Sequence, residues 1–192
     1  MFKYLFERLY KIIFQPAKSW EILADEKEEE IIDNDSFFKT YLYPIIGIVA
    51  LLTFAGVFFH KKEFEVQLAL RLTITVLIAL FAGFYLASFL LSKAMERLFL
   101  RKDNDKLCQR FVGYSSALIY VMYMVLAIFP DFGFLQLLLL YTIYIIWEGA
   151  PIYMQIPEDE RNKFTAVATA IVLLSPYIIE KIMFFTMPGL RT

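Results

Sequence analysis

The chain has 192 residues, of which 59% are apolar, with a formal net charge of −1 and a mean hydropathy of +0.58. Ordinary globular proteins are about 45–50% apolar, and a soluble fold of this length has nowhere to bury the excess. We therefore expect the lipid bilayer to be the main partner, and the near-neutral charge gives no indication of a nucleic-acid partner.

The N-terminal residues predict an amphipathic helix. When successive residues are rotated by about 100°, the polar side chains fall within an arc of about 140°. These side chains are Lys3, Glu7, Arg8, Lys11 and Gln15. Apolar residues fill the rest of the surface, which is typical of a helix lying in the membrane interface. The alternative is that the apolar face packs on the rest of the protein. Pro16 ends this helix or opens a second one, in which Trp20 suits headgroup depth.

Five apolar stretches follow, and each is long enough to cross about 30 Å of hydrocarbon. They are residues 41–59, 68–91, 112–129, 135–153 and 164–185. The second helix is expected to continue past the membrane to residue 97. The Pro-Asp-Phe-Gly run at 130–133 has the composition of a tight turn, so the third and fourth spans should form an antiparallel hairpin.

The fold class predicted is therefore all-α: a polytopic membrane protein of five transmembrane helices with an N-terminal amphipathic interfacial helix. Residues 1–40 are expected to be a cytoplasmic N-terminal segment. Residues 41–187 are expected to form the five-helix transmembrane domain. Residues 188–192 would then be an extracytoplasmic tail.

The orientation rests on Lys and Arg, which gather in the short cytoplasmic loops of membrane proteins. With the N-terminus in the cytoplasm, 14 of the 19 basic residues fall on that side. They are Lys3, Arg8, Lys11, Lys18, Lys27, Lys39, Lys93, Arg97, Arg101, Lys102, Lys106, Arg110, Arg161 and Lys163. Five spans then place the C-terminus outside. The basic loop at 93–110 either contacts anionic lipid headgroups or serves only as the topology signal.

Ionisable residues within spans are costly and are functional candidates by default. Arg71, Glu180 and Lys181 all lie towards the outer end of their helices. We hypothesise an ion pair between Arg71 and Glu180 that locks the second span to the fifth. The alternative is that each of these side chains extends to the outer headgroups.

Glu148 is the fourth candidate, near the inner end of the fourth span. Gly149 and Pro151 follow it and favour a helix break. A carboxylate beside irregular backbone can bind cations or carry protons, as in transporters with discontinuous helices. The alternative is a buried structural carboxylate that is bonded to a Tyr, Ser or Arg of another helix.

Signatures of catalysis are missing from the sequence. His60 is the only histidine, and the chain has no metal-ligand spacing and no phosphate-binding glycine loop. Ser115 and Ser116 have no partner base at a fixed spacing. We expect no catalytic residues, no metal, no cofactor and no enzyme activity.

The chain resembles the Yip domain family (Ypt-interacting proteins), in particular its bacterial members. The resemblance rests on several short motifs between residues 16 and 187. They are Pro16-x-x-x-Trp20-x-Ile22, Tyr43-Pro44, Gly113-Tyr114-Ser115, Tyr141-x-x-Tyr144 through Gly149 and Pro151, and Met154-x-x-Pro157-Glu158. The family implies five spans and a cytoplasmic N-terminus, here in the bacterial inner (plasma) membrane. Its eukaryotic members are associated with Rab-type GTPases, but their Asp-Leu-Tyr-Gly-Pro motif is absent here.

Two hypotheses about function follow. The first is a non-enzymatic membrane organiser, whose amphipathic helix and basic loop act on the bilayer, on a protein partner or on a second copy of the chain. The second is a small ion or solute transporter or channel that uses Glu148, with Arg71 and Glu180 on the opposite side.

Overall fold

The structure is a computed structural model that describes residues 2–28, 34–60, 65–101 and 104–186. All regular secondary structure in these residues is helical. The elements are α1 (Phe2–Phe14), α2 (Pro16–Glu28), α3 (Asn34–Phe37), the π-helix η1 (Phe38–Leu42), α4 (Tyr43–His60), α5 (Val66–Leu98), α6 (Asp105–Ser115), α7 (Ala117–Ile128), the 3₁₀-helix η2 (Pro130–Tyr141), α8 (Thr142–Ile152) and α9 (Glu158–Thr186). The predicted tail at 188–192 lies outside the described residues.

Four helical stretches are long and apolar enough to cross a membrane, namely 35–59, 66–98, 130–152 and 158–186. The helices α6 and α7 are bent by 41° relative to each other, and they make a fifth stretch if the bent pair counts as one span. The predicted span at 112–129 is therefore not one straight helix. Its break falls at Ser116, whose hydroxyl donates to the Val112 carbonyl at 2.8 Å.

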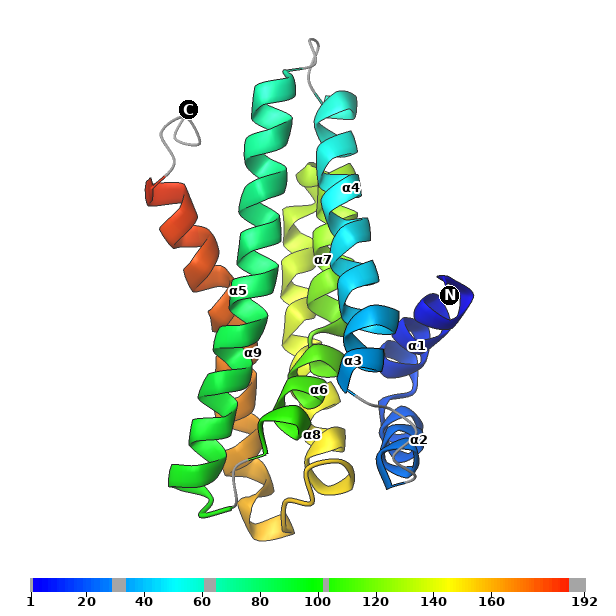
Figure 1. The fold of residues 1–192 in the computed structure, drawn as a ribbon, viewed down its shortest axis with the longest axis vertical. Helices are drawn as coiled ribbons and strands as arrows, with labels where there is room; N and C mark the ends of the chain where they lie inside the picture. Colours follow the sequence, from blue (N-terminus) through cyan, green and yellow to red (C-terminus); the bar gives the residue numbers. More distant parts are fainter. Residues whose placement is uncertain (1, 29–33, 61–64, 102–103, 187–192) are drawn as a thin grey trace.

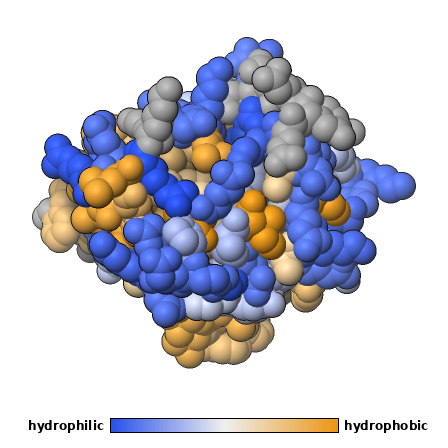
Figure 2. Space-filling view, turned by 90° about the horizontal axis from the view of Figure 1, so that it is seen from below, coloured by the Kyte–Doolittle hydropathy of each residue, from blue (hydrophilic) through white to orange (hydrophobic). Residues whose placement is uncertain are grey.

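The helices form an elongated bundle, with the end of α4 and the start of α5 at its upper end in Figure 1 and α8 and α9 joined at its lower end. Helix α5 packs along α9 and α4, while α4 also packs on α7. A single residue, Phe129, separates α7 from η2, whose backbone is non-helical at Phe132, within the predicted turn. Helix η2 also packs on α7, as expected for the predicted hairpin. Viewed from below, the lower end is mostly hydrophilic (Figure 2).

Two glycines set the closest helix crossings. A Cβ on Gly56 of α4 would lie 2.0 Å from the carbonyl oxygen of Ala127 in α7. A Cβ on Gly83 of α5 would lie 2.6 Å from Cα of Pro176 in α9. Small residues allow helix backbones to approach in membranes, where van der Waals packing drives association.

The N-terminal segment packs on the bundle, since α2 packs on α8 and α1 packs on α2 and α7. An aromatic cluster joins these parts in the lower half of the bundle. Trp20, Phe37, Tyr41 and Phe111 in this cluster are each at most 1% exposed. Through Trp20 the cluster fixes α2 against the side of the bundle, and α1 lies next to α2 (Figure 1).

Candidate functional site

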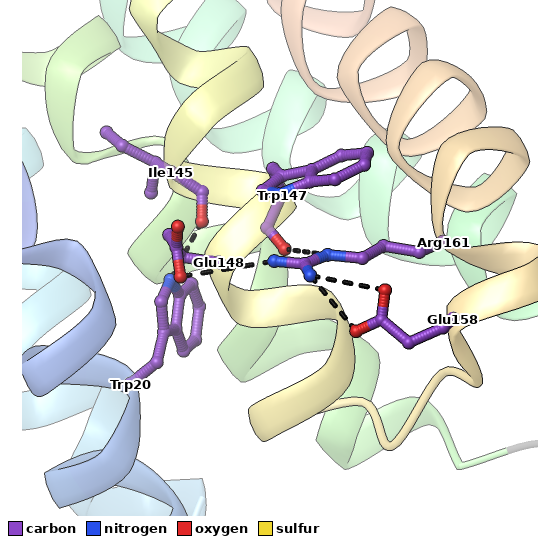
Figure 3. Close-up of polar contacts among 6 residues, drawn as sticks. All are labelled: Trp20, Ile145, Trp147, Glu148, Glu158 and Arg161. Carbon is purple, nitrogen blue, oxygen red and sulfur yellow. Dashed lines mark hydrogen bonds and ion pairs between the residues drawn. The ribbon is translucent and has the colours of Figure 1, made fainter.

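The end of α8 carries a carbonyl group that its own helix cannot satisfy. Pro151 has no backbone N–H, so it cannot donate to the carbonyl of Trp147 one turn earlier. Arg161, in the first turns of α9, donates from Nε to this carbonyl at 3.1 Å (Figure 3). The arginine therefore joins α9 to α8 at the point where the proline interrupts the hydrogen-bond ladder.

The same guanidinium group is surrounded by further partners (Figure 3). It lies over the Trp147 ring, 4.2 Å from its centroid, and donates to Glu158 Oε1 at 3.1 Å. One of its terminal nitrogens, Nη2, is 4.0 Å from Oε2 of Glu148. The side chains of Arg161 and Glu148 are only 14% and 21% exposed. Glu148 therefore has a cation from another helix beside it, as expected for the structural alternative.

Trp20 of α2 approaches α8 from the other side (Figure 3). Its indole N–H donates to the Ile145 carbonyl at 2.9 Å, and its ring stacks on Phe111 at 5.1 Å. A Cβ on Gly149 would lie 2.5 Å from the indole ring. Helix α8 runs through Gly149 without the predicted break and ends one residue after Pro151. The glycine provides space for the tryptophan.

At the upper end, Glu180 pairs differently from the prediction. The hydroxyl group of Tyr123 in α7 donates to Glu180 Oε2 at 2.5 Å. Among the described residues, no ion pair joins Glu180 to Arg71, so the proposed lock between α5 and α9 is not formed. The reason is that the upper part of α9 leans away from α5 (Figure 1). Arg71 is half-buried in α5.

Lys181 is exposed, and its ammonium group lies over two rings of its own helix. The distances from Nζ to the ring centroids are 5.2 Å for Tyr177 and 6.0 Å for Phe184. Cation–π contacts of this kind hold a charge at the edge of an apolar surface. Lys181 thus fits the alternative of a side chain that extends towards the headgroups.

Helix α1 has three faces. Leu5, Leu9 and Ile12 point inward and are at most 4% exposed. A second face carries aromatic side chains that remain accessible: Phe6 is 52% exposed, Tyr10 57% and Phe14 67%. The third face is charged, and the alternative in which α1 packs on the protein is confirmed for the aliphatic residues only.

An ion pair between Arg8 and Glu26 fastens α1 to α2. Burial is the largest single influence on the pKa of Arg8 and lowers it, but the hydrogen bond to Glu26 and the charges of Tyr114, Tyr4 and Glu26 together raise the pKa above its usual value. On the charged face, a hydrogen bond from Lys11 at 2.9 Å lowers the pKa of Glu7. The aromatic face is thereby held in a fixed orientation relative to the bundle.

The sequence reasoning missed Arg161 and Tyr123 as partners. A signal for Arg161 was present, since a proline late in a helix leaves an unpaired carbonyl four residues earlier. No such signal marks Tyr123, because one tyrosine among twelve carries no pattern. Within the described residues, no three His, Cys, Asp or Glu side chains form a group that could hold a metal ion.

Comparison with known proteins places this sequence in a family. The model of the Yip1 domain matches residues 10–179, from within α1 to the upper part of α9. Neither the curated proteins nor the solved structures contain a match. The matched segment includes the α2–α8–α9 contacts and the helices able to cross a membrane, apart from the last seven residues of α9. Because the match covers far more than half of the chain, the protein is a multi-pass membrane protein that belongs to the Yip1 domain family.

Proposed function

We propose that the protein is a non-enzymatic membrane organiser that acts through the aromatic face of α1, formed by Phe6, Tyr10 and Phe14. The observation that carries this proposal is that α1 is fixed to the bundle by one apolar face and still presents a second one. A helix held only by packing has no need of that second face. Exposed aromatic residues favour the boundary between headgroups and hydrocarbon.

The charges beside the aromatic face support a membrane surface as its target. Lys3 and Lys11 belong to the same helix, and basic residues flanking an apolar face strengthen binding to anionic lipids. The lower end of the bundle is mostly hydrophilic (Figure 2), and it contains the end of α5 with Lys93 and Arg97. We propose that this end faces the cytoplasm of a bacterial cell, with five spans and the C-terminus outside.

Two measurements test the location of α1. Single cysteines at Phe6, Tyr10 and Phe14 would be spin-labelled in proteoliposomes that contain anionic lipid, with Cys108→Ser as the background. Labels on this face should be accessible to oxygen and shielded from a water-soluble nickel reagent. The matched controls are cysteines at Glu7 and Lys11, which should show the reverse. Equal nickel accessibility on both faces would exclude contact between α1 and the membrane.

The organising activity itself is tested by vesicle shape. Wild-type protein, reconstituted at increasing density, should shift the distribution of vesicle diameters in electron micrographs. The triple variant Phe6→Ser, Tyr10→Ser, Phe14→Ser should not, although its Leu5 and Leu9 face remains packed. The other outcome is that this face binds a protein partner. In that case the wild-type protein would capture a partner that the triple variant does not, and neither protein would change the vesicles.

The orientation has its own test. A reporter fused after Thr192 should behave as extracytoplasmic if α6 and α7 together form one span. A cytoplasmic signal would mean four spans, with the bent pair not crossing.

The transporter hypothesis has less support, because Glu148 lies beside Arg161 instead of facing a channel. Flux of ions into proteoliposomes decides between the two hypotheses. A flux that Glu148→Gln abolishes would replace the organiser proposal.

A further inference from the structure

A cavity of about 830 Å³ lies in the upper half of the bundle. Its walls come from α4, α5, α7, η2 and α9. Protein interiors are otherwise packed with few voids larger than a water molecule, whereas ligand pockets are about 300–1,000 Å³. The cavity therefore has the size of a binding site and is too large to be a packing defect.

Two residues explain why the bundle opens here. Pro176 removes the backbone donor that would bond to the Val172 carbonyl, and such a loss bends a helix. Gly83 lets the α9 backbone touch α5 at Pro176, and beyond this crossing the upper part of α9 leans away (Figure 1). The cavity includes this crossing and extends from it towards the upper end, as its lining includes Pro176 and Lys181.

The walls are mostly aliphatic, with Leu72 and Val76 from α5, Leu126 from α7 and Leu139 from η2. Along α9 the lining runs from Leu173 to Lys181. These eight steps correspond to about 12 Å at about 1.5 Å per residue. One leaflet contributes about half of the 30 Å hydrocarbon core. A cavity of this length and composition matches a hydrocarbon chain from a single leaflet.

The upper end of the cavity carries both an acid and a base. Glu180 and Lys181 are consecutive and both line the cavity. Glu180 accepts a hydrogen bond from Tyr123, but a carboxylate has further acceptor positions. Glu180 lies five residues, or about 8 Å of helix, before residue 185, where the fifth apolar stretch of the sequence ends. The pair thus lies near the depth where lipid headgroups begin.

We propose that this cavity binds one phospholipid with a primary amine in its headgroup. An acyl chain occupies the aliphatic part, the lipid phosphate accepts from Lys181, and the lipid ammonium donates to Glu180. A choline headgroup has no N–H to donate to Glu180, and a glycerol headgroup leaves this carboxylate without a cation. Both acid and base lie beyond residue 179, where the family match ends, and the site does not involve α1.

The experiment uses full-length protein in nanodiscs of equimolar phosphatidylethanolamine, phosphatidylcholine and phosphatidylglycerol. After release into mild detergent, native mass spectrometry counts the retained lipids by class. Wild-type protein should retain one phosphatidylethanolamine in preference to the other two. Loss of one partly exposed ion pair, in Lys181→Gln or Glu180→Gln, should reduce that preference by roughly two- to fivefold.

Variants that fill the cavity test its position separately. Leu126→Trp and Val76→Phe add volume from two different walls and should abolish retention of every lipid class. Ile182→Trp is the matched control, because Ile182 is 51% exposed and does not line the cavity. Size-exclusion profiles establish that each variant is folded. If Leu126→Trp does not fold, Val76→Phe serves as the test, and the reverse.

Three results would overturn the proposal. The first is retention that neither filling variant changes. The second is a lipid preference that survives both Glu180→Gln and Lys181→Gln. The third is a dimer mass without bound lipid, which would assign the opening to a second copy of the chain.

Discussion

Substituting alanine at Gly149 tests the contact that joins the N-terminal segment to the bundle. The new Cβ would lie 2.5 Å from Cε2 and 2.8 Å from Nε1 of Trp20, which is fully buried. Overpacking of this kind costs about 1–3 kcal/mol. A displaced indole also loses its bond to the Ile145 carbonyl, worth about 1 kcal/mol. Alanine returns up to about 1 kcal/mol because it favours the helix more than glycine does. The net expectation is a loss of about 1–3 kcal/mol.

The apparent Tm in detergent measures this loss. For a protein of this size, each 1 kcal/mol shifts the Tm by about 2–4 °C, so Gly149→Ala should lower it by several degrees. Gly47→Ala is the control, since no atom lies within 4 Å of a Cβ at that position of α4. This variant should leave the Tm unchanged or raise it slightly, because only the helix propensity changes.

The sign of the effect decides whether the reasoning holds. If Trp20 did not rest against α8, Gly149→Ala would behave like Gly47→Ala and stabilise the protein. The double variant separates the contact from any general effect on α8: with Trp20→Ala in place, adding Gly149→Ala should cost almost nothing. The same penalty in both backgrounds would refute the assignment of the glycine to the tryptophan.

Three further predictions follow from the same structure. Gly56→Ala should destabilise more than Gly149→Ala, because its Cβ would lie 2.0 Å from the Ala127 carbonyl oxygen, a backbone atom that cannot rotate away; the Tm in detergent checks this order. Tyr123→Phe should cost about 1.5–3 kcal/mol, as it removes the donor to the Glu180 carboxylate, and an unchanged Tm would argue against that bond. Arg161→Lys should destabilise by about 1–3 kcal/mol despite its retained charge, since lysine lacks the planar fork; proteolysis at the α8–α9 turn should increase in parallel, and a wild-type rate would contradict the role of Arg161.

Long apolar runs made most of the helices predictable. The run at 68–91, followed by helix-forming residues to 97, corresponds closely to α5 at Val66–Leu98. Hydrophobic length is set by the bilayer, so it can be read without knowing the neighbours. The bend at Ser116 and the 3₁₀ geometry of η2 could not be predicted in this way. Both depend on which carbonyl a given N–H or hydroxyl group meets after packing.

The pairing of charges was less predictable than their depth. Position along a helix correctly grouped Arg71 with Glu180 at one end of the bundle. It contains no information on the direction in which each side chain points, nor on the lean of α9 that separates the two helices. Tyr123 supplied the hydrogen bond instead. The depth of a side chain follows from its residue number. The lean of α9 instead depends on the contact between Gly83 and Pro176, which the sequence around neither residue reveals.

Two prolines therefore give the two ends of the bundle different properties. Each removes a donor from its helix, and the outcome depends on what stands opposite. At Pro151 the carbonyl of Trp147 that the proline leaves free accepts a hydrogen bond from Arg161. This bond holds α8 and α9 together at the lower end. Near Pro176 the upper part of α9 begins to lean away from α5 (Figure 1), and the cavity lies between these helices and their neighbours. The two ends are therefore held differently: Arg161 anchors the first turns of α9 to α8, whereas the bond between Tyr123 and Glu180 holds its last turns to α7 beside the cavity.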